Sequence, residues 1–179
     1  SKADKVEEEV KELLKRAKAL SDRVSEESRR LLKELRDSAR RVEEEVKRLE
    51  EELRKLKEDG KSEEEVRKVV EEIRELLTRN NKTSEEVVRR IRKLNDDAVK
   101  EVTEVVKEIE KLLREVAREG KISEEKVRRV LREVREMLKD LEKKHRDDIK
   151  RVTEVLKEDE EKNRDLMRKV DKFLEDIRK

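Results

Sequence analysis

The sequence predicts an all-α fold, an antiparallel up-down-up three-helix bundle of long, nearly straight helices. Three observations lead to this prediction. Leu, Val and Ile recur at helical spacing along the 179 residues, the only two glycines divide the chain into three segments of nearly equal length, and proline is absent. Because long helices joined by minimal loops pack antiparallel, we expect one domain that covers residues 1–179.

The two glycines mark the expected helix ends. Gly60 and Gly120 suit the left-handed conformation that closes a helix C-terminus. Ser62 and Ser123 follow them and can cap the next helix with their hydroxyl groups. The expected helices therefore span about residues 2–58, 63–118 and 124–178.

Each segment carries one apolar stripe. In the first segment the stripe positions alternate steps of four and three residues, with two extra steps of four. These extra steps raise the mean spacing to about 3.6 residues, which predicts nearly straight helices with little supercoil. A helix of about 56 residues is about 84 Å long, and stripes about 120–140° wide can face two neighbouring helices.

One part of the second segment admits two interpretations. The residues from Thr78 to Glu86 are poor in helix formers, and residues 81–86 resemble the loop at Gly120 with Asn in the glycine position. This predicts a break at residues 80–84. However, the apolar stripe keeps its phase from Leu77 to Val88, which favours a continuous helix because a chain reversal would preserve the phase only by accident.

Polar residues interrupt the stripes at two levels of the predicted bundle. A chain reversal at Gly60 places residues of the first and second helices side by side when their numbers sum to about 121. A reversal at Gly120 does the same for residues of the second and third helices whose numbers sum to about 242. Candidates for one level are Ser25, Ser28, Asn95, His145 and Asp148, and candidates for the other are Ser38, Asn80, Asn81, Ser84, Asp159 and Asn163. Because a buried polar group without a hydrogen bond costs about 1–3 kcal/mol, the matched levels predict two buried networks.

The whole chain resembles de novo designed helical bundles with buried hydrogen-bond networks. The resemblance rests on its Glu/Lys/Arg surface, its Leu/Val/Ile core, its Gly-Lys-Ser loop at residues 60–62 and its matched Ser, Asn and His levels. It implies high stability, a fixed helix register and, since many such bundles are protomers of designed heterodimers, a possible single partner helix. Spectrin-like repeats fit less well because they are shorter and usually carry a core Trp.

Composition argues against several classes of function. The 53 basic and 51 acidic residues are interleaved, so no one-sided basic field is available for nucleic acid. Phe173 is the only aromatic residue for stacking on bases. No apolar run reaches the length of a membrane span, and no small-molecule substrate or cofactor motif is found. We expect a soluble synthetic protein without a native compartment, produced in bacterial cytoplasm.

His145 is the only histidine and the main candidate for chemistry. Glu142 and His145 have the Glu-x-x-His spacing of carboxylate-bridged metal bundles, but a second such motif is absent. The serines lie on expected helix faces, not on a strained nucleophile elbow. We therefore expect no catalytic site and no metal site, and interpret His145 as a member of a polar core level.

Two functions remain open at the level of the sequence. One is a closed monomeric scaffold that needs no partner. The alternative is a binding module, the three-helix part of a split four-helix bundle that accepts one partner helix. The second function predicts a groove between two helices, with flanking positions such as Leu14, Leu32, Leu131 and Leu138 along it. The polar levels have contributors from all three helices without a fourth, which favours the scaffold.

Overall fold

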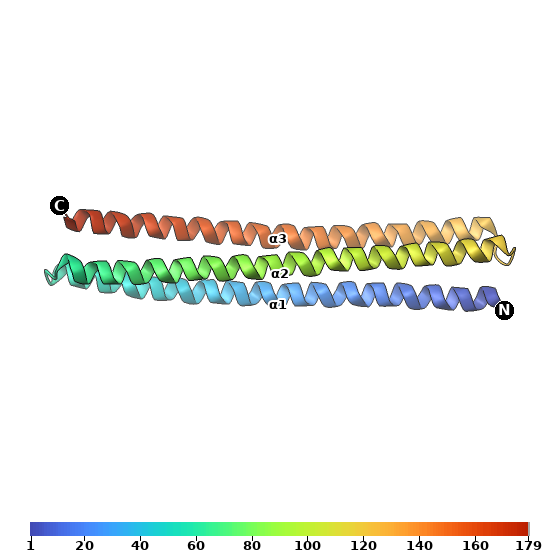
Figure 1. Cartoon of the computed structure of the whole chain (residues 1–179), viewed down its shortest axis with the longest axis horizontal. Coiled ribbons are helices and arrows are strands. Elements are labelled where there is room, and N and C mark those ends of the chain that lie inside the picture. The colour runs from blue at the N-terminus through green and yellow to red at the C-terminus, as the bar shows by residue number, and fades with distance from the viewer. Residues whose placement is uncertain (179) are drawn as a thin grey trace. The chain divides into compact units, whose positions relative to one another are not determined.

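Three long helices account for nearly all of the protein (Figure 1). The computed structural model describes residues 1–178. The helices are α1 (Lys2–Glu58), α2 (Glu63–Arg118) and α3 (Glu124–Arg178), and no strand occurs within this range. The predicted all-α class is confirmed, and the observed helices begin and end at the residues expected from the sequence.

Both interhelical turns use a glycine in the left-handed region. Gly60 has φ +65° and Gly120 has φ +70°. After α1, the Gly60 amide donates to the Lys57 carbonyl at 3.2 Å, and the next amide donates to the Leu56 carbonyl at 3.0 Å. This pair of bonds is the Schellman arrangement, which satisfies carbonyls that a helix end would otherwise leave unpaired.

Serine caps begin the second and third helices. The Ser62 hydroxyl accepts a hydrogen bond from the Glu65 amide at 3.4 Å, and the Ser123 hydroxyl accepts one from the Lys126 amide at 3.1 Å. Each cap satisfies a backbone donor that has no partner inside the helix. The chain therefore stops and restarts its helices within a few residues.

Helix α2 continues through the segment that was poor in helix formers. Residues 80–84 are helical, so the alternative of a break at Asn80–Ser84 is wrong. Asn80 and Ser84 are buried at 6% and 2% exposure, and both side chains donate hydrogen bonds to α3. Tertiary contacts thus outweigh the weak intrinsic helix propensity of Asn and Ser here.

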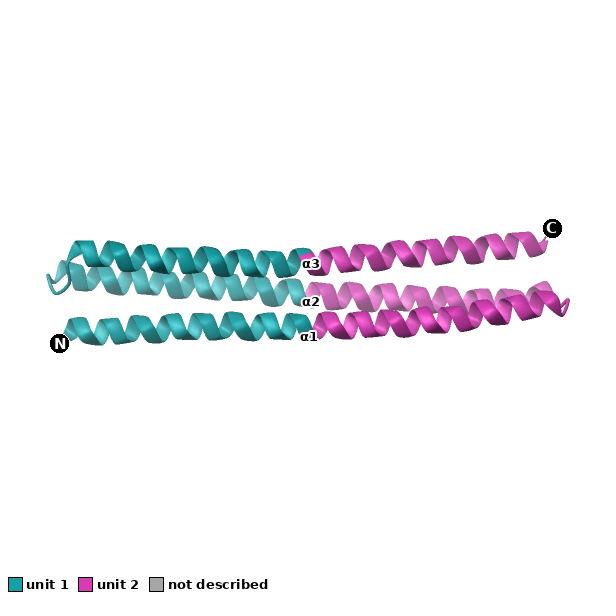
Figure 2. Ribbon diagram, turned by 180° about the vertical axis from the view of Figure 1, so that it is seen from behind, with its two compact units in different colours: residues 1–29, 91–150 teal, residues 30–90, 151–179 magenta. Residues whose placement is uncertain are grey.

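Contacts group the chain into two compact units, each built from part of every helix (Figure 2). Unit 1 contains Ser1–Arg29 and Ile91–Lys150, and unit 2 contains Arg30–Arg90 and the chain from Arg151 onward. Within each unit the α2 segment runs antiparallel to the segments of α1 and α3, which confirms the three-helix, up-down-up packing. The expectation of a single domain stays a prediction.

Each unit has its own apolar core, to which all three helices contribute. In unit 1 the main cluster contains Val6, Val10, Val106, Ile109, Leu113, Val116, Val127, Leu131 and Val134. In unit 2 it contains Val46, Leu49, Leu53, Val66, Val69, Val70, Ile73, Leu77, Val170 and Leu174. Full burial of one large aliphatic side chain contributes about 1.5–3 kcal/mol before entropy is subtracted, so these clusters are the main source of stability.

Candidate functional site

A polar cluster in unit 1, the histidine layer, consists of Ser21, Ser25, Ser28, Asn95, His145 and Asp148. Asn95 and His145 are completely buried, at 0% exposure. Asn95 comes from α2, His145 from α3 and the serines from α1. The structure therefore brings together every residue that the sequence placed at this level, and adds Ser21.

Asn95 is the centre of the histidine layer. Its amide nitrogen donates to the Ile91 carbonyl at 2.7 Å and to the Ser28 hydroxyl at 2.9 Å. The Ser28 hydroxyl in turn donates to the Val24 carbonyl at 2.8 Å. Because a backbone carbonyl only accepts, these bonds fix which end of the Asn95 side chain is the nitrogen.

The orientation of Asn95 also fixes the tautomer of His145. The Asn95 Oδ1 lies 2.7 Å from His145 Nδ1, and since this oxygen only accepts, Nδ1 must carry a proton. In the neutral ring Nε2 is then an acceptor. The Ser21 hydroxyl, 2.8 Å away, donates to it. Both ring nitrogens are satisfied in the neutral form.

Burial lowers the pKa of His145 below its usual value, because the interior disfavours the charged imidazolium. The carboxylate of Asp148 opposes this shift, and the ammonium of Lys144 reinforces it. Asp148 accepts a hydrogen bond from Ser25 at 3.2 Å at the partly buried edge of the layer. The layer therefore holds a neutral histidine with a complete set of partners.

Ser21 was absent from the sequence prediction, although the sequence contained a signal for it. Ser21 follows Ala17 by four residues and precedes Ser25 by four, the spacing of one helix face. The apolar stripe of the first segment, with its steps of three and four residues from Ala17 to Val24, passes through the neighbouring Leu20 instead. In the structure Leu20 is half-buried, whereas Ser21 has 0% exposure.

A second polar cluster, the aspartate layer, lies in unit 2 and consists of Asn80, Asn81, Ser84, Asp159 and Asn163. Asp159 Oδ2 accepts hydrogen bonds from Asn80 Nδ2 at 3.2 Å and from the Ser84 hydroxyl at 3.4 Å. Asn163 Nδ2 donates to Asn81 Oδ1 at 2.6 Å. All of these bonds join α2 to α3.

Helix α1 does not complete the aspartate layer. Ser38, which the sequence placed at this level, is half-buried, and among residues 1–178 the structure shows no hydrogen bond of its side chain. Its position on α1 is level with the layer but its hydroxyl is not joined to it. Ser38 therefore does not take part in the aspartate layer, in which the sequence had placed it.

Burial raises the pKa of Asp159 above its usual value. Hydrogen bonds from Asn80 and Ser84 and the charge of Lys162 oppose this shift without cancelling it. Both hydrogen bonds reach Oδ2, and in the described part of the chain no hydrogen bond reaches Oδ1. The carboxylate is thus partly desolvated at a half-buried position.

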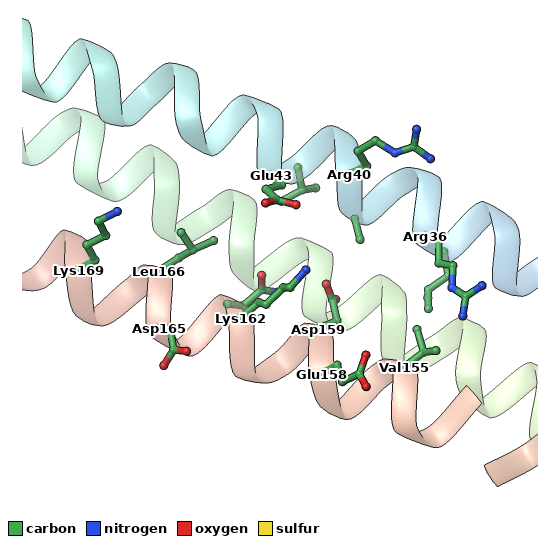
Figure 3. A pocket seen from close by; sticks show the side chains of 14 residues that line it. Arg36, Arg40, Glu43, Val155, Glu158, Asp159, Lys162, Asp165, Leu166 and Lys169 are labelled. Atoms are coloured by element: carbon green, nitrogen blue, oxygen red, sulfur yellow. The ribbon is translucent and has the colours of Figure 1, made fainter. Parts of the chain in front are cut away.

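A groove between α1 and α3 of unit 2 adjoins the aspartate layer. It consists of two cavities of about 660 and 440 Å³, both of which contact Lys169. The larger has an apolar floor that includes Leu35, Val42, Val155 and Leu166. In Figure 3, Asp159 and Leu166 extend from α3 toward α1 along this cavity. Each cavity is many times the roughly 30 Å³ that one water occupies in the liquid.

The positions that the sequence suggested for a groove lie elsewhere. Leu14, Leu131 and Leu138 belong to the core of unit 1 or pack against it. Leu32 is buried at 7% exposure. The groove instead follows the α1 and α3 segments of unit 2.

The histidine layer is closed to solvent, since His145 and Asn95 both have 0% exposure. Both nitrogens of His145 are engaged in hydrogen bonds. Within residues 1–178, no group of three or more His, Asp or Glu side chains is arranged to hold a metal ion. The described helices also contain no stretch long and apolar enough to cross a membrane.

No protein-family model matches the chain, and no curated protein sequence is similar to it. The chain is similar to a solved structure described as "Computationally designed three helix bundle", with 18% identity and a TM-score of 0.40 over 97% of this chain and 86% of the other. The fold described above rests on the helices and their packing, not on this similarity.

Proposed function

We propose that the protein is a designed structural scaffold, a helical bundle without a natural biochemical activity whose buried polar layers fix the register of its helices. The observation that supports this proposal is the complete set of hydrogen bonds around Asn95 and His145 at 0% exposure. Each buried group that loses its partner costs about 1–3 kcal/mol. A shift of one helix along the others would leave several of these buried groups without a hydrogen-bond partner at once.

An apolar replacement of the layer tests this role. The variant combines Ser21→Ala, Ser28→Ala, Asn95→Leu and His145→Leu. We expect its stability to equal or exceed that of the parent, since apolar residues often replace buried polar groups without loss. We also expect several helix registers, seen as multiple sets of amide resonances or mixed masses in solution. One mass and one set of resonances with the parent's interhelical contacts would contradict the proposal.

A second candidate function is a binding module that accepts one partner helix. The groove in unit 2 favours it, because an apolar floor between two helices is the usual receptor for an amphipathic helix. A hydrophobic dye provides a first test. We expect dye fluorescence with the folded chain and its loss in Ala39→Trp, which fills the larger cavity. Absence of dye binding would leave the scaffold as the sole function.

A further inference from the structure

A run of ten residues in the α1 segment of unit 2 has no buried side chain. Residues 36–45 are all exposed or half-buried, whereas Leu35 and Val46 on either side of the run are buried at 4% and 0% exposure. Val42 is the large apolar residue of the run, and it is half-buried. Nearly three turns of α1 therefore contribute little to the core of unit 2.

The larger cavity of the groove lies against this run. Arg36, Ala39, Arg40, Val42 and Glu43 line the cavity of about 660 Å³ (Figure 3), so this side of α1 faces open space. Polar contacts do not take the place of the missing apolar ones. Among the residues that the structure describes, no hydrogen bond or ion pair joins residues 36–45 to another helix, and the ion pairs of the run stay within α1.

The other two helices are held more firmly near the same level. A stretch of α3, residues 153–162, also has no buried side chain, but its Asp159 accepts hydrogen bonds from Asn80 and Ser84 of α2. On α2, Leu77, Asn80 and Ser84 are all buried. Burial thus holds α2 and hydrogen bonds hold α3, whereas residues 36–45 of α1 have neither.

We propose that residues 36–45 of α1 open locally while α2 and α3 stay folded, and that this opening makes the run a cleavage site for proteases that cut after arginine. Segments with few buried apolar contacts open at a lower free energy than the core. A protease binds its substrate as an extended chain, so a helix must open before it is cut. The rate of cleavage then follows the population of the open form.

The run has the side chains that such a protease recognises. Arg36, Arg40 and Arg41 are exposed, and the run contains no Lys. Cleavage after Arg41 breaks its peptide bond to Val42. One water molecule supplies the hydroxyl of the new carboxyl group on Arg41 and a hydrogen of the new amino group on Val42. An arginine-specific protease reaches this run and does not cut after Lys61 in the first turn.

Limited proteolysis of the full chain under native conditions, read by mass spectrometry, tests the site. Among arginines in helix interiors, we expect cleavage first after Arg36, Arg40 or Arg41. These cuts should be about tenfold or more faster than cuts after Arg79 on α2 and Arg164 on α3, which are also exposed. A first interior cut outside residues 36–45 would overturn the site.

Hydrogen exchange on the unaltered chain tests the opening without a protease. The backbone amides of residues 38–45 of α1 should exchange about tenfold or more faster than those of residues 76–83 of α2, which lie opposite them. The amides of residues 157–162 of α3 should fall between the two. Equal protection of the three segments would overturn the local opening.

Two variants test its cause. Ala39→Leu adds a large apolar side chain beside the cavity and should slow cleavage in the run about tenfold. Ala19→Leu makes the same change at an exposed position of unit 1 and should leave cleavage unchanged. Equal rates in the two variants would show that the cavity is not the cause of the opening.

A third variant separates local opening from global unfolding. Asn95→Ala weakens the histidine layer in unit 1, far along the chain from the run. Local opening predicts an unchanged rate of cleavage after Arg36, Arg40 and Arg41. Global unfolding predicts a rate that rises roughly a hundredfold with the unfolded population, and this result would overturn the proposal.

Discussion

The two polar layers use similar residues but differ in how completely they are closed. In the histidine layer all three helices contribute, and the hydrogen bonds from Ser21 to Ser28 pass through His145 and Asn95 at 0% exposure. In the aspartate layer the hydrogen bonds join only α2 and α3. On the α1 side of that layer lies the groove.

The difference shows that a polar layer is complete only when donors and acceptors balance. The buried hydrogen bonds of the histidine layer, from Ser21 through His145 and Asn95 to Ser28, join hydroxyl, amide and imidazole groups, each of which can both donate and accept. The carboxylate of this layer, Asp148, lies at its partly buried edge and accepts from Ser25. The aspartate layer contains a carboxylate, which when ionised only accepts. Asp159 has two donors from α2 but none from α1, because Ser38 does not reach it. The open side of the layer follows from this imbalance.

The largest effect is expected from Asn95→Ala. The change removes the acceptor of His145 Nδ1 and a donor to Ser28 and Ile91, and leaves a cavity. We expect a loss of roughly 3–4 kcal/mol in the free energy of unfolding, measured by guanidinium denaturation. Asp96→Ala, at the exposed neighbouring position, is the control. A loss no larger than that of the control would show that the histidine layer adds nothing to stability.

The second largest effect is expected from a decrease in pH, which acts on His145 in the histidine layer. Because the folded pKa of His145 is lowered, the unfolded chain takes up a proton first as pH falls below about 6.5. The bundle should therefore lose stability from that pH down to the folded pKa, and none above it. His145→Gln, which does not titrate, should lack this loss. An NMR titration midpoint of His145 at or above 6.5 would contradict the buried neutral ring.

Asn163→Ala should cost less than Asn95→Ala. Asn163 has one hydrogen bond, to Asn81, and borders the groove, so water can replace the lost amide. We expect a loss of about 1 kcal/mol in the free energy of unfolding, measured under the same conditions as Asn95→Ala. Equal losses in the two variants would remove the distinction between the layers.

The smallest effect, of opposite sign, is expected from Asp159→Asn. The amide keeps an acceptor for Asn80 and Ser84 and removes a desolvated charge, so at pH 7 the variant should be more stable by up to about 1 kcal/mol. The raised pKa of Asp159 means that the folded parent takes up a proton before the unfolded chain as pH falls. The parent should therefore gain stability through that window and approach the variant. A less stable variant at pH 7 would show that the charge is favourable without a partner.

The helices could be predicted from the sequence because their signals are local. Gly60 and Gly120 stand where a left-handed residue is needed, and the apolar phase across Asn80–Ser84 indicates a continuous helix. These signals depend on spacing along the chain alone. The helix boundaries in the structure agree with them.

The pairing within the layers could not be predicted because it depends on helix rotation. The residue numbers that sum to about 121 or 242 give the level of a residue in the bundle, but not the direction of its side chain. Ser21 and Leu20 lie at nearly the same level, but their side chains point in directions about 100° apart around the helix axis. This difference in direction decides which of the two side chains is buried. The groove depends on the distance between α1 and α3, which is set by side chains from three helices together.

Side-chain amide hydrogen exchange of Asn95 and Asn163 tests the difference between the layers most directly. Both are asparagines with low exposure, 0% and 5%, so intrinsic chemistry and burial are nearly matched. We predict that the Asn95 amide exchanges only with global unfolding, and that the Asn163 amide exchanges faster by local opening toward the groove. Equal protection of the two amides would contradict a closed histidine layer and an open aspartate layer.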